Sequence, residues 1–232
     1  MDRISKSSLA TYLSCNRKYY YSLVGFEVIP NKYMQYGTEF HEIIENYNKN
    51  LMLNKENKEV KSLKYKNNLI SYIDFLNSLE QKGYEKIPYR CEMPVKYEQY
   101  FGFIDVIFTN KKTDKFLIVD FKTIPNFTLF DEDKYKQELI FYAYTFSKMN
   151  NIDIKNIETI LLRFEQNGDK FDENVVKFTE DDINSTFIMV DEMKNKLNTS
   201  TGSIDDFKMI DLSKSSYTCK YCDYFNICNI NK

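Results

Sequence analysis

The sequence of 232 residues has no tryptophan, a single histidine, six glycines and four prolines. So little glycine and proline excludes collagen-like and low-complexity chains, and no Gly/Ser linker or internal repeat divides the sequence. No run of about 18 apolar residues occurs, so we expect no transmembrane helix and no membrane partner. The first residues lack the apolar segment of a signal peptide, and we therefore expect a cytoplasmic protein.

The charge is nearly balanced, with 32 basic and 34 acidic side chains and a formal net charge of −2. This balance does not by itself indicate a nucleic-acid-binding protein, although a site that holds divalent cations must itself be acidic. The 19 tyrosines and 18 phenylalanines are expected mostly in the core, and a few could stack on bases. In a reducing compartment, the five cysteines are more typical of thiols or metal ligands than of disulfides.

Hydrophobic periodicity alternates between helical and strand-like segments. Helical spacing predicts helices over residues 7–23, 36–53, 60–82, 132–149 and 180–197. Strand character is present at residues 91–98, 101–109, 116–121, 157–164 and 171–178, with a hairpin signal at Asn167-Gly168. This order predicts an α/β fold with a mixed central sheet, in which the helix at 132–149 crosses over between two apolar strands.

We expect one domain over residues 1–232. It would consist of an N-terminal helical part at 1–85, a core at 86–180, and a C-terminal part at 181–232 that holds a helix and three cysteines.

Two polar side chains end the most apolar strand. Asp120 and Lys122 are two residues apart, so on a strand they point to the same face, where burial is costly unless they are paired or used. Asp105 lies on the preceding strand, and an antiparallel register brings it near Asp120. Two carboxylates at one place form an oxygen site for Mg²⁺ or Mn²⁺, with the carbonyl of Phe121 as a further ligand. A structural Asp–Lys ion pair is the alternative interpretation.

Such a site would suit phosphodiester hydrolysis. A divalent cation polarises a phosphodiester oxygen and lowers the pKa of a bound water. Lys122 would orient that water or stabilise the charge that develops on the phosphate oxygens. The only histidine, His41, lies on a predicted helix four residues before Glu45 and on the same face, although a lone histidine is usually structural.

Cysteines lie at both ends of the chain. Cys15 is near the N-terminus, and Cys219, Cys222 and Cys228 form a C-x2-C-x5-C pattern near the C-terminus. Four thiolates hold either tetrahedral zinc or a [4Fe–4S] cluster, and the spacing alone leaves both open. Either centre would join the two ends of the fold. Cys91, in a predicted strand, is expected to be a core thiol.

Five motifs occur in a familiar order: S-S-L-x-x-Y-x-x-C-x-R-K-Y at 7–19, G-T-x-x-H-x-x-x-E at 37–45, G-F-I-D at 102–105, V-D-F-K-T at 119–123, and the C-terminal cysteines. Together they resemble the PD-(D/E)XK nuclease superfamily, specifically the RecB-like branch with an iron–sulfur cluster. That branch includes the AddB nuclease domain and the CRISPR-associated nuclease that trims new spacers. The resemblance runs from about residue 5 to residue 228 and implies a restriction-endonuclease-like core.

The resemblance also implies roles for single residues. His41, Asp105, Asp120 and the Phe121 carbonyl would bind Mg²⁺ or Mn²⁺, with Lys122, Asp120 and Asp105 as the catalytic residues. The four terminal cysteines would bind a [4Fe–4S] cluster, with zinc as the less favoured metal. Glu92 matches a position where such families often carry glutamate, and we expect it to support the site without binding the metal directly.

The sequence departs from the family pattern at three points. Ile104 replaces the proline that gives the family its name, and Asp120 stands where some relatives have glutamate. A glutamine usually lies four residues before the motif tyrosine, but here Glu138 precedes Tyr142 at that distance and Gln137 is one place off. Substrate contacts are expected from Tyr142, Gln137 and Arg17.

The expected function is a metal-dependent DNA exonuclease that acts on single strands or DNA ends, in DNA repair, phage DNA processing or CRISPR adaptation. The alternative is a catalytically silent iron–sulfur subunit that binds DNA or docks on a partner in a nuclease–helicase or integrase complex. No G-x-x-x-x-G-K-[ST] motif is present, so a helicase or integrase partner would be a separate chain.

Overall fold

The computed structural model describes residues 4–28, 30–57, 63–125, 132–166, 170–208, 219 and 222–230. The predicted hairpin turn at Asn167-Gly168 and the start of the helix predicted at 60–82 lie outside these residues. None of the helices in the described ranges is both long enough and apolar enough to cross a membrane.

A mixed sheet forms the centre of the molecule, as predicted. Its strands are β1 (Ile4–Ser5), β2 (Arg90–Tyr97), β3 (Tyr100–Asn110), β4 (Lys115–Ile124), β5 (Ile157–Glu165) and β6 (Phe171–Val175). The strand order is β1-β3-β4-β5-β6, with β2 paired to β3. The β2–β3, β3–β4 and β5–β6 pairs are antiparallel, whereas β1–β3 and β4–β5 are parallel. The parallel β4–β5 pair confirms the predicted crossover through the intervening helix.

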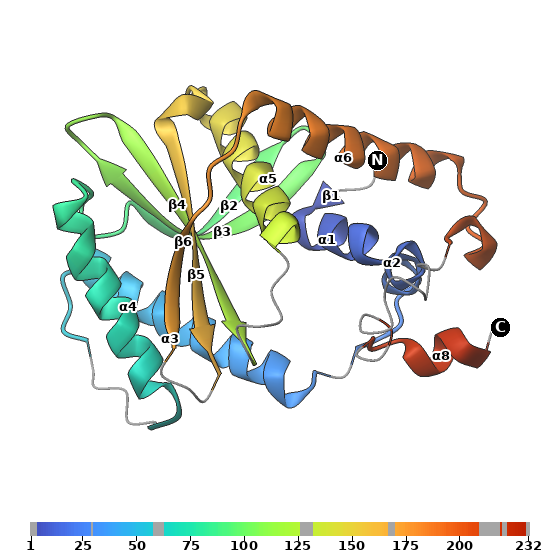
Figure 1. Ribbon diagram of the computed structural model, residues 1–232, viewed down its shortest axis with the longest axis horizontal. Helices are drawn as coiled ribbons and strands as arrows, with labels where there is room; N and C mark the ends of the chain where they lie inside the picture. Colours follow the sequence, from blue (N-terminus) through green and yellow to red (C-terminus); the bar gives the residue numbers. More distant parts are fainter. Residues whose placement is uncertain are drawn as a thin grey trace.

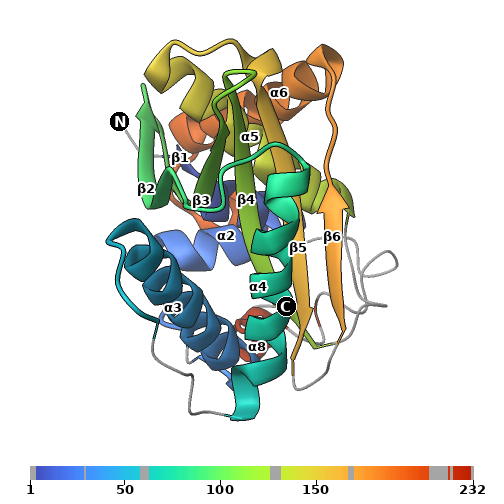
Figure 2. The same cartoon turned by 90° about the vertical axis from the view of Figure 1, so that its left-hand side faces the viewer.

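Helices cover both faces of this sheet (Figures 1 and 2). They are α1 (Lys6–Ser14), α2 (Asn16–Leu23), α3 (Lys32–Met52), α4 (Leu63–Gln81), α5 (Glu132–Asn150), α6 (Glu180–Thr199) and α8 (Phe225–Ile230), with short 3₁₀ helices η1 (Ile154–Asn156) and η2 (Ile204–Asp206). One core lies between the sheet and α3 and α4, and a second lies between the sheet and α1, α5 and α6. Leu117 and Val119 of β4 enter the first core and Ile118 enters the second, which is why this strand is apolar on both faces.

The helix predicted at 7–23 is two helices. Cys15 has φ −169° and ψ 118°, an extended conformation that ends α1 and begins α2. The periodicity missed this break because both helices bury residues of the same core, including Leu9 and Tyr19.

The C-terminal segment, residues 222–230, packs against α2 in the N-terminal part of the chain. The ring of Tyr224 lies 5.4 Å from that of Tyr21 in α2, and its hydroxyl donates a hydrogen bond to the Phe26 carbonyl. Lys18 forms an ion pair with Asp223 at 3.2 Å. These contacts fasten the C-terminal segment to α2. In Figure 1, α8 lies below α2.

Candidate active site

The site lies where β3 and β4 separate. Their paired residues run from Asn110↔Lys115 to Val106↔Val119 and then stop, so Asp105 and Asp120 occupy the next position on each strand, as the sequence register predicted. The backbone N–H of Phe121 donates to the Asp105 carboxylate at 2.7 Å. The Asp105 carboxylate therefore accepts a hydrogen bond at the point where the β3–β4 ladder ends, and this bond holds the carboxylate in place. We call this point, with Asp105, Asp120 and Phe121, the fork.

Glu92 lies on the other side of Asp105. The pairs Cys91↔Val106 and Met93↔Ile104 flank it, so Glu92 faces Asp105 across the β2–β3 ladder. Its φ of 45° lies in the left-handed region, which costs a residue with a side chain of this kind roughly 1–3 kcal/mol. Such strain at the fork is typical of a functional position.

His41 reaches the fork from α3. At Gly37, one turn earlier on the same helix face, an added Cβ would lie 3.1 Å from Thr123 Oγ1, so α3 approaches β4 closely there. His41 Nδ1 lies 3.9 Å from Asp105 Oδ2, and its ring meets that of Phe121 edge-on at 5.9 Å.

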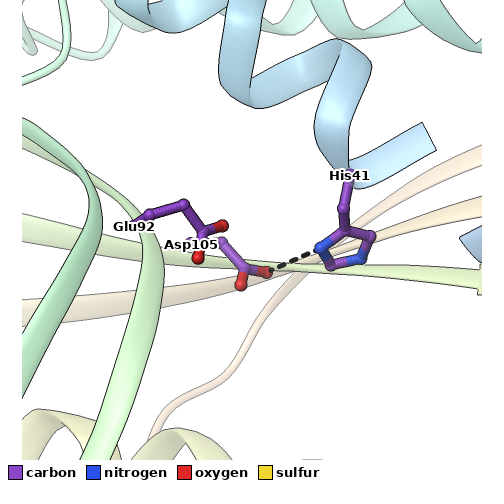
Figure 3. A group of neighbouring side chains, drawn as sticks. All are labelled: His41, Glu92 and Asp105. Atoms are coloured by element: carbon purple, nitrogen blue, oxygen red, sulfur yellow. Dashed lines mark ion pairs between the residues drawn. The ribbon is translucent and has the colours of Figure 1, made fainter. Parts of the chain in front are cut away.

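His41, Glu92 and Asp105 converge as one group (Figure 3). Each offers one donor atom, and these atoms all lie within 4.8 Å of one another. An imidazole nitrogen with two carboxylate oxygens is a donor set that suits Mg²⁺ or Mn²⁺. The residues present therefore fit the implied cation, and Glu92 lies closer to the donor set than the sequence reasoning expected.

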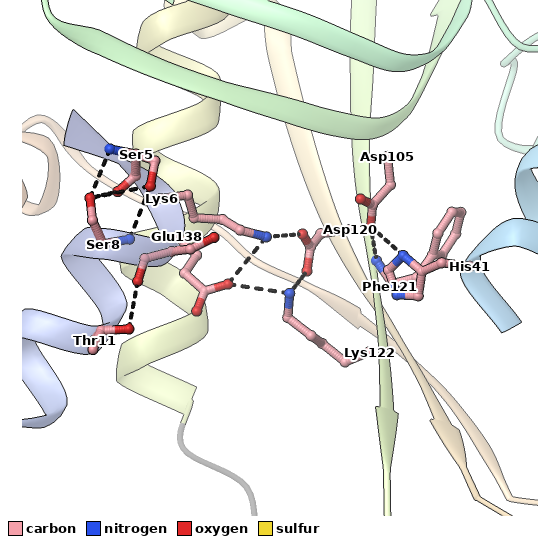
Figure 4. A network of polar contacts seen from close by, with 11 residues as sticks. Ser5, Lys6, Ser8, Thr11, His41, Asp105, Asp120, Phe121, Lys122 and Glu138 are labelled. Atoms are coloured by element: carbon pink, nitrogen blue, oxygen red, sulfur yellow. Dashed lines mark hydrogen bonds and ion pairs between the residues drawn. The ribbon is translucent and has the colours of Figure 1, made fainter. Parts of the chain in front are cut away.

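Asp120 points toward a second cluster, which contains two lysines and a further carboxylate (Figure 4). Its oxygens lie 2.8 Å from Lys6 Nζ and 2.5 Å from Lys122 Nζ. Glu138 Oε2 of α5 lies 3.4 Å from Lys6 Nζ and 3.2 Å from Lys122 Nζ. We call these four residues the lysine–carboxylate cluster. Asp120 and Lys122 share a face, as their spacing predicted.

Lys6 is the residue of this cluster that sequence reasoning missed. The pairing of β1 with β3 and a reciprocal capping box between Ser5 and Ser8 start α1 at Lys6 and place it against the fork. Glu138 is the sequence feature that could have predicted a lysine here. A glutamate in place of the family's glutamine needs a nearby cation when it is buried.

The two clusters differ in electrostatic balance. Burial alone would raise the pKa of Asp120, but Lys122 and Lys6 outweigh it and hold that pKa well below its ordinary value. For Lys6 and Lys122, burial by itself would lower the pKa. The neighbouring carboxylates, Asp120 first, outweigh burial and raise the pKa of both lysines. The lysine–carboxylate cluster is thus internally neutralised.

The other group has a surplus of negative charge. Burial and the charge of Asp120 raise the pKa of Asp105, although His41 opposes the rise. Burial, followed by the charges of Asp105 and Glu45, raises the pKa of Glu92 to about 7. Carboxylates that raise one another's pKa are relieved by a bound cation, which again fits a divalent metal ion.

The predicted substrate-contact residues lie in different surroundings. The ring of Tyr142 lies 4.7 Å from Lys6 Nζ and is therefore beside the lysine–carboxylate cluster. Gln137 instead lies against Met189 of α6, at 3.6 Å, and Arg17 Nε donates to the Phe207 carbonyl at 3.3 Å. Neither of these two contacts involves a residue of the fork.

Of the terminal cysteines, Cys15 and Cys222 lie near enough for their thiols to interact. Burial raises the pKa of the Cys222 thiol and Cys15 adds to the rise, so these two thiols interact electrostatically. A tetrahedral zinc site, with Zn–S bonds of about 2.3 Å, places its sulfurs about 3.8 Å apart. Within the described part of the chain, the group of His41, Glu92 and Asp105 is the one that meets a 4.8 Å limit, and no set of three cysteines does. A preformed zinc site is therefore absent from the described cysteines.

A cavity of about 910 Å³ lies elsewhere, between α5, η1, β5, β6 and the start of α6. Tyr144, Ile157 and Phe178 are among its lining residues, and no residue of the fork contributes to it. We therefore place the candidate active site at the fork, on its chemistry.

Comparison with known proteins gives a family. No curated protein matches the sequence. The crystal structure of SSO0001 is similar at 15% identity and a TM-score of 0.46, over 99% of this chain and 86% of that chain. The family model of the PD-(D/E)XK nuclease superfamily matches residues 3–229, nearly the whole chain. The chain therefore belongs to the PD-(D/E)XK nuclease superfamily.

Proposed function

We propose that this protein is a metal-dependent deoxyribonuclease that hydrolyses phosphodiester bonds as an exonuclease on single-stranded DNA or DNA ends. The observation that carries the proposal is the fork, where His41, Glu92 and Asp105 meet within 4.8 Å beside Asp120 and Lys122. Membership of a nuclease superfamily supports the reaction class. A silent docking subunit would have no need to keep this acidic group and its lysine together.

Mg²⁺ or Mn²⁺ would be held by His41, Asp105 and Asp120 with the Phe121 carbonyl, and we add Glu92 to this set. When bound, the cation would polarise a phosphodiester oxygen and lower the pKa of a bound water. Asp105 bridges β3 and β4 by accepting a hydrogen bond from the Phe121 amide, which fixes the position of its carboxylate. Lys122 presents an ammonium group, oriented by Asp120 and Glu138, to stabilise negative charge on the phosphate.

We further propose that Cys15, Cys219, Cys222 and Cys228 hold a [4Fe–4S] cluster with a structural role. The contacts between α2 and the C-terminal segment support this, because they already bring the two ends together. Contacts of DNA with Tyr142, Gln137 and Arg17 remain predictions, as does a helicase or integrase partner.

The test uses linear and circular single-stranded DNA with Mn²⁺ and anaerobically purified protein. We expect degradation of the linear strand only, and loss of that activity in Lys122→Ala. Lys136→Ala is the matched control, since Lys136 of α5 pairs with Asp182 at 2.7 Å and not with the fork. Cleavage of circles would show an endonuclease, and no cleavage by folded wild-type protein would favour the docking subunit.

A further inference from the structure

Each carboxylate oxygen of Asp120 lies beside an ammonium group, although only Oδ1 accepts a hydrogen bond from one. Lys6 lies at Oδ1 and Lys122 at Oδ2, and the Asp120 side chain is only 2% exposed. With so little water to screen them, an ammonium group and a divalent cation on the same carboxylate repel each other strongly. Asp120 can therefore bind a cation well only if one lysine withdraws.

Lys6 has a second position available. Glu138 Oε2 lies 3.4 Å from Lys6 Nζ, and its side chain is 8% exposed. The Tyr142 ring lies 4.7 Å from the same ammonium group and attracts it further. Lys6 can thus leave Asp120 without becoming an unpaired buried charge, which would otherwise be strongly destabilising.

We propose that Lys6 is a positioning residue that neutralises Asp120 in the cation-free site and transfers to Glu138 when a divalent cation binds. This inference rests on the proposed function, because it takes Asp120 as a metal ligand. It also gives Glu138 a role: the carboxylate that replaces the family's glutamine receives the displaced ammonium group.

The test is calorimetric titration of the anaerobically purified holoprotein with Mn²⁺. Lys6→Met removes the competing cation, and coupled binding events typically change affinity about 5- to 150-fold, so we expect Mn²⁺ to bind at least about fivefold more tightly. Lys136→Met removes the same charge from α5 without touching Asp120 and should change the affinity less than about twofold. Asp105→Asn should abolish binding and so identify the site.

The two variants distinguish a wrong role for Lys6 from a wrong metal site. If Asp105→Asn abolishes Mn²⁺ binding while Lys6→Met leaves it unchanged or weaker, the role of Lys6 is wrong and the proposed metal site stands. If Mn²⁺ binding is absent or insensitive to Asp105→Asn, the metal site itself is wrong and the Lys6 inference falls with it.

A measurement on the wild-type protein covers the case in which Lys6→Met does not fold. The ammonium signal of Lys6, followed by nitrogen-15 NMR during a Mg²⁺ titration, should shift as the site saturates, while that of Lys136 stays in place. A Lys6 signal that is unmoved at saturation overturns the proposal.

Discussion

At the scale of single residues, Asp105 organises the site. Its carboxylate accepts the Phe121 amide, lies 3.9 Å from His41, and has an acidic neighbour on each adjoining strand, Glu92 and Asp120. Such a concentration of carboxylates is unfavourable in an empty apolar fold, and the Lys6 and Lys122 ammonium groups offset it on one side only. The other side is the place where a cation stabilises the protein.

Gly102 positions the Tyr142 ring. An added Cβ would lie 2.7 Å from Tyr142 Cε1, closer than real contacts allow. Gly102→Ala should therefore push the ring away from Lys6, cost about 1–3 kcal/mol of unfolding free energy, and reduce the nuclease rate about tenfold or more. Denaturant unfolding and single-turnover cleavage would measure the two effects.

Gly25→Ala is the control for that variant. Gly25 has φ 81° but no atom within 4 Å of an added Cβ, so alanine there brings backbone strain without touching the site. It should lower stability and leave the cleavage rate unchanged. Equal rate losses in both variants would show that Tyr142 placement is not the cause.

At the scale of elements, the ends of helices decide how the site is presented. The capping box of Ser5 and Ser8 starts α1 directly at Lys6, and the extended Cys15 separates α1 from α2. The helix predicted at 7–23 did not include the break at Cys15. Helical periodicity detects which face is buried, and it does not detect one extended residue between two helices that share a core.

The N-terminus of α6 offers a test of capping and of pH dependence. Thr179 and Asp182 form a capping box, and Lys136 pairs with Asp182. The Lys136 contact, followed by the Thr179 amide, lowers the pKa of Asp182 to about 2. Thr179→Ala should cost about 1 kcal/mol in denaturant unfolding, because one amide at the helix start loses its partner.

The lowered pKa of Asp182 makes the stability of the protein fall at low pH. The pKa of Asp182 in the folded protein lies below its value of about 3.9 in unfolded chains. The ionised Asp182 therefore stabilises the fold above about pH 3.9, and this stabilisation is lost as the pH falls toward 2. NMR titration of the Asp182 carboxyl should give a midpoint near 2 in the wild type and a higher midpoint in Lys136→Met. An unchanged midpoint in that variant would show that Lys136 does not hold the charge.

At the scale of the whole molecule, the sheet separates two cores, and residues 222–230 pack against α2. The contacts of Tyr224 with Tyr21 and Phe26, and of Asp223 with Lys18, are among the links between these segments. The Lys18–Asp223 pair is partly exposed and therefore weak. A cluster on the four terminal cysteines would add the main restraint there.

Iron removal tests this restraint. An iron chelator under anaerobic conditions should abolish the visible absorbance of the cluster and make residues 222–230 more sensitive to limited proteolysis. His41, Glu92 and Asp105 lie on α3, β2 and β3, none of which carries a terminal cysteine, so Mn²⁺ binding that depends on Asp105 should survive. Proteolysis that is unchanged after complete iron loss would show that the contacts of Tyr224 are sufficient by themselves.

Most of the helices and strands, the buried strand at 116–121 and the motif positions His41, Asp105, Asp120 and Lys122 were predictable from local sequence patterns. Periodicity and short spacings are local properties of a chain, so they can be recognised without knowing how the chain folds. Which groups lie together at the fork became visible only in the folded chain. Lys6 is 114 residues from Asp120, and Glu92 joins His41 through an unusual backbone conformation, so both placements depend on sheet register and helix packing that no local pattern contains.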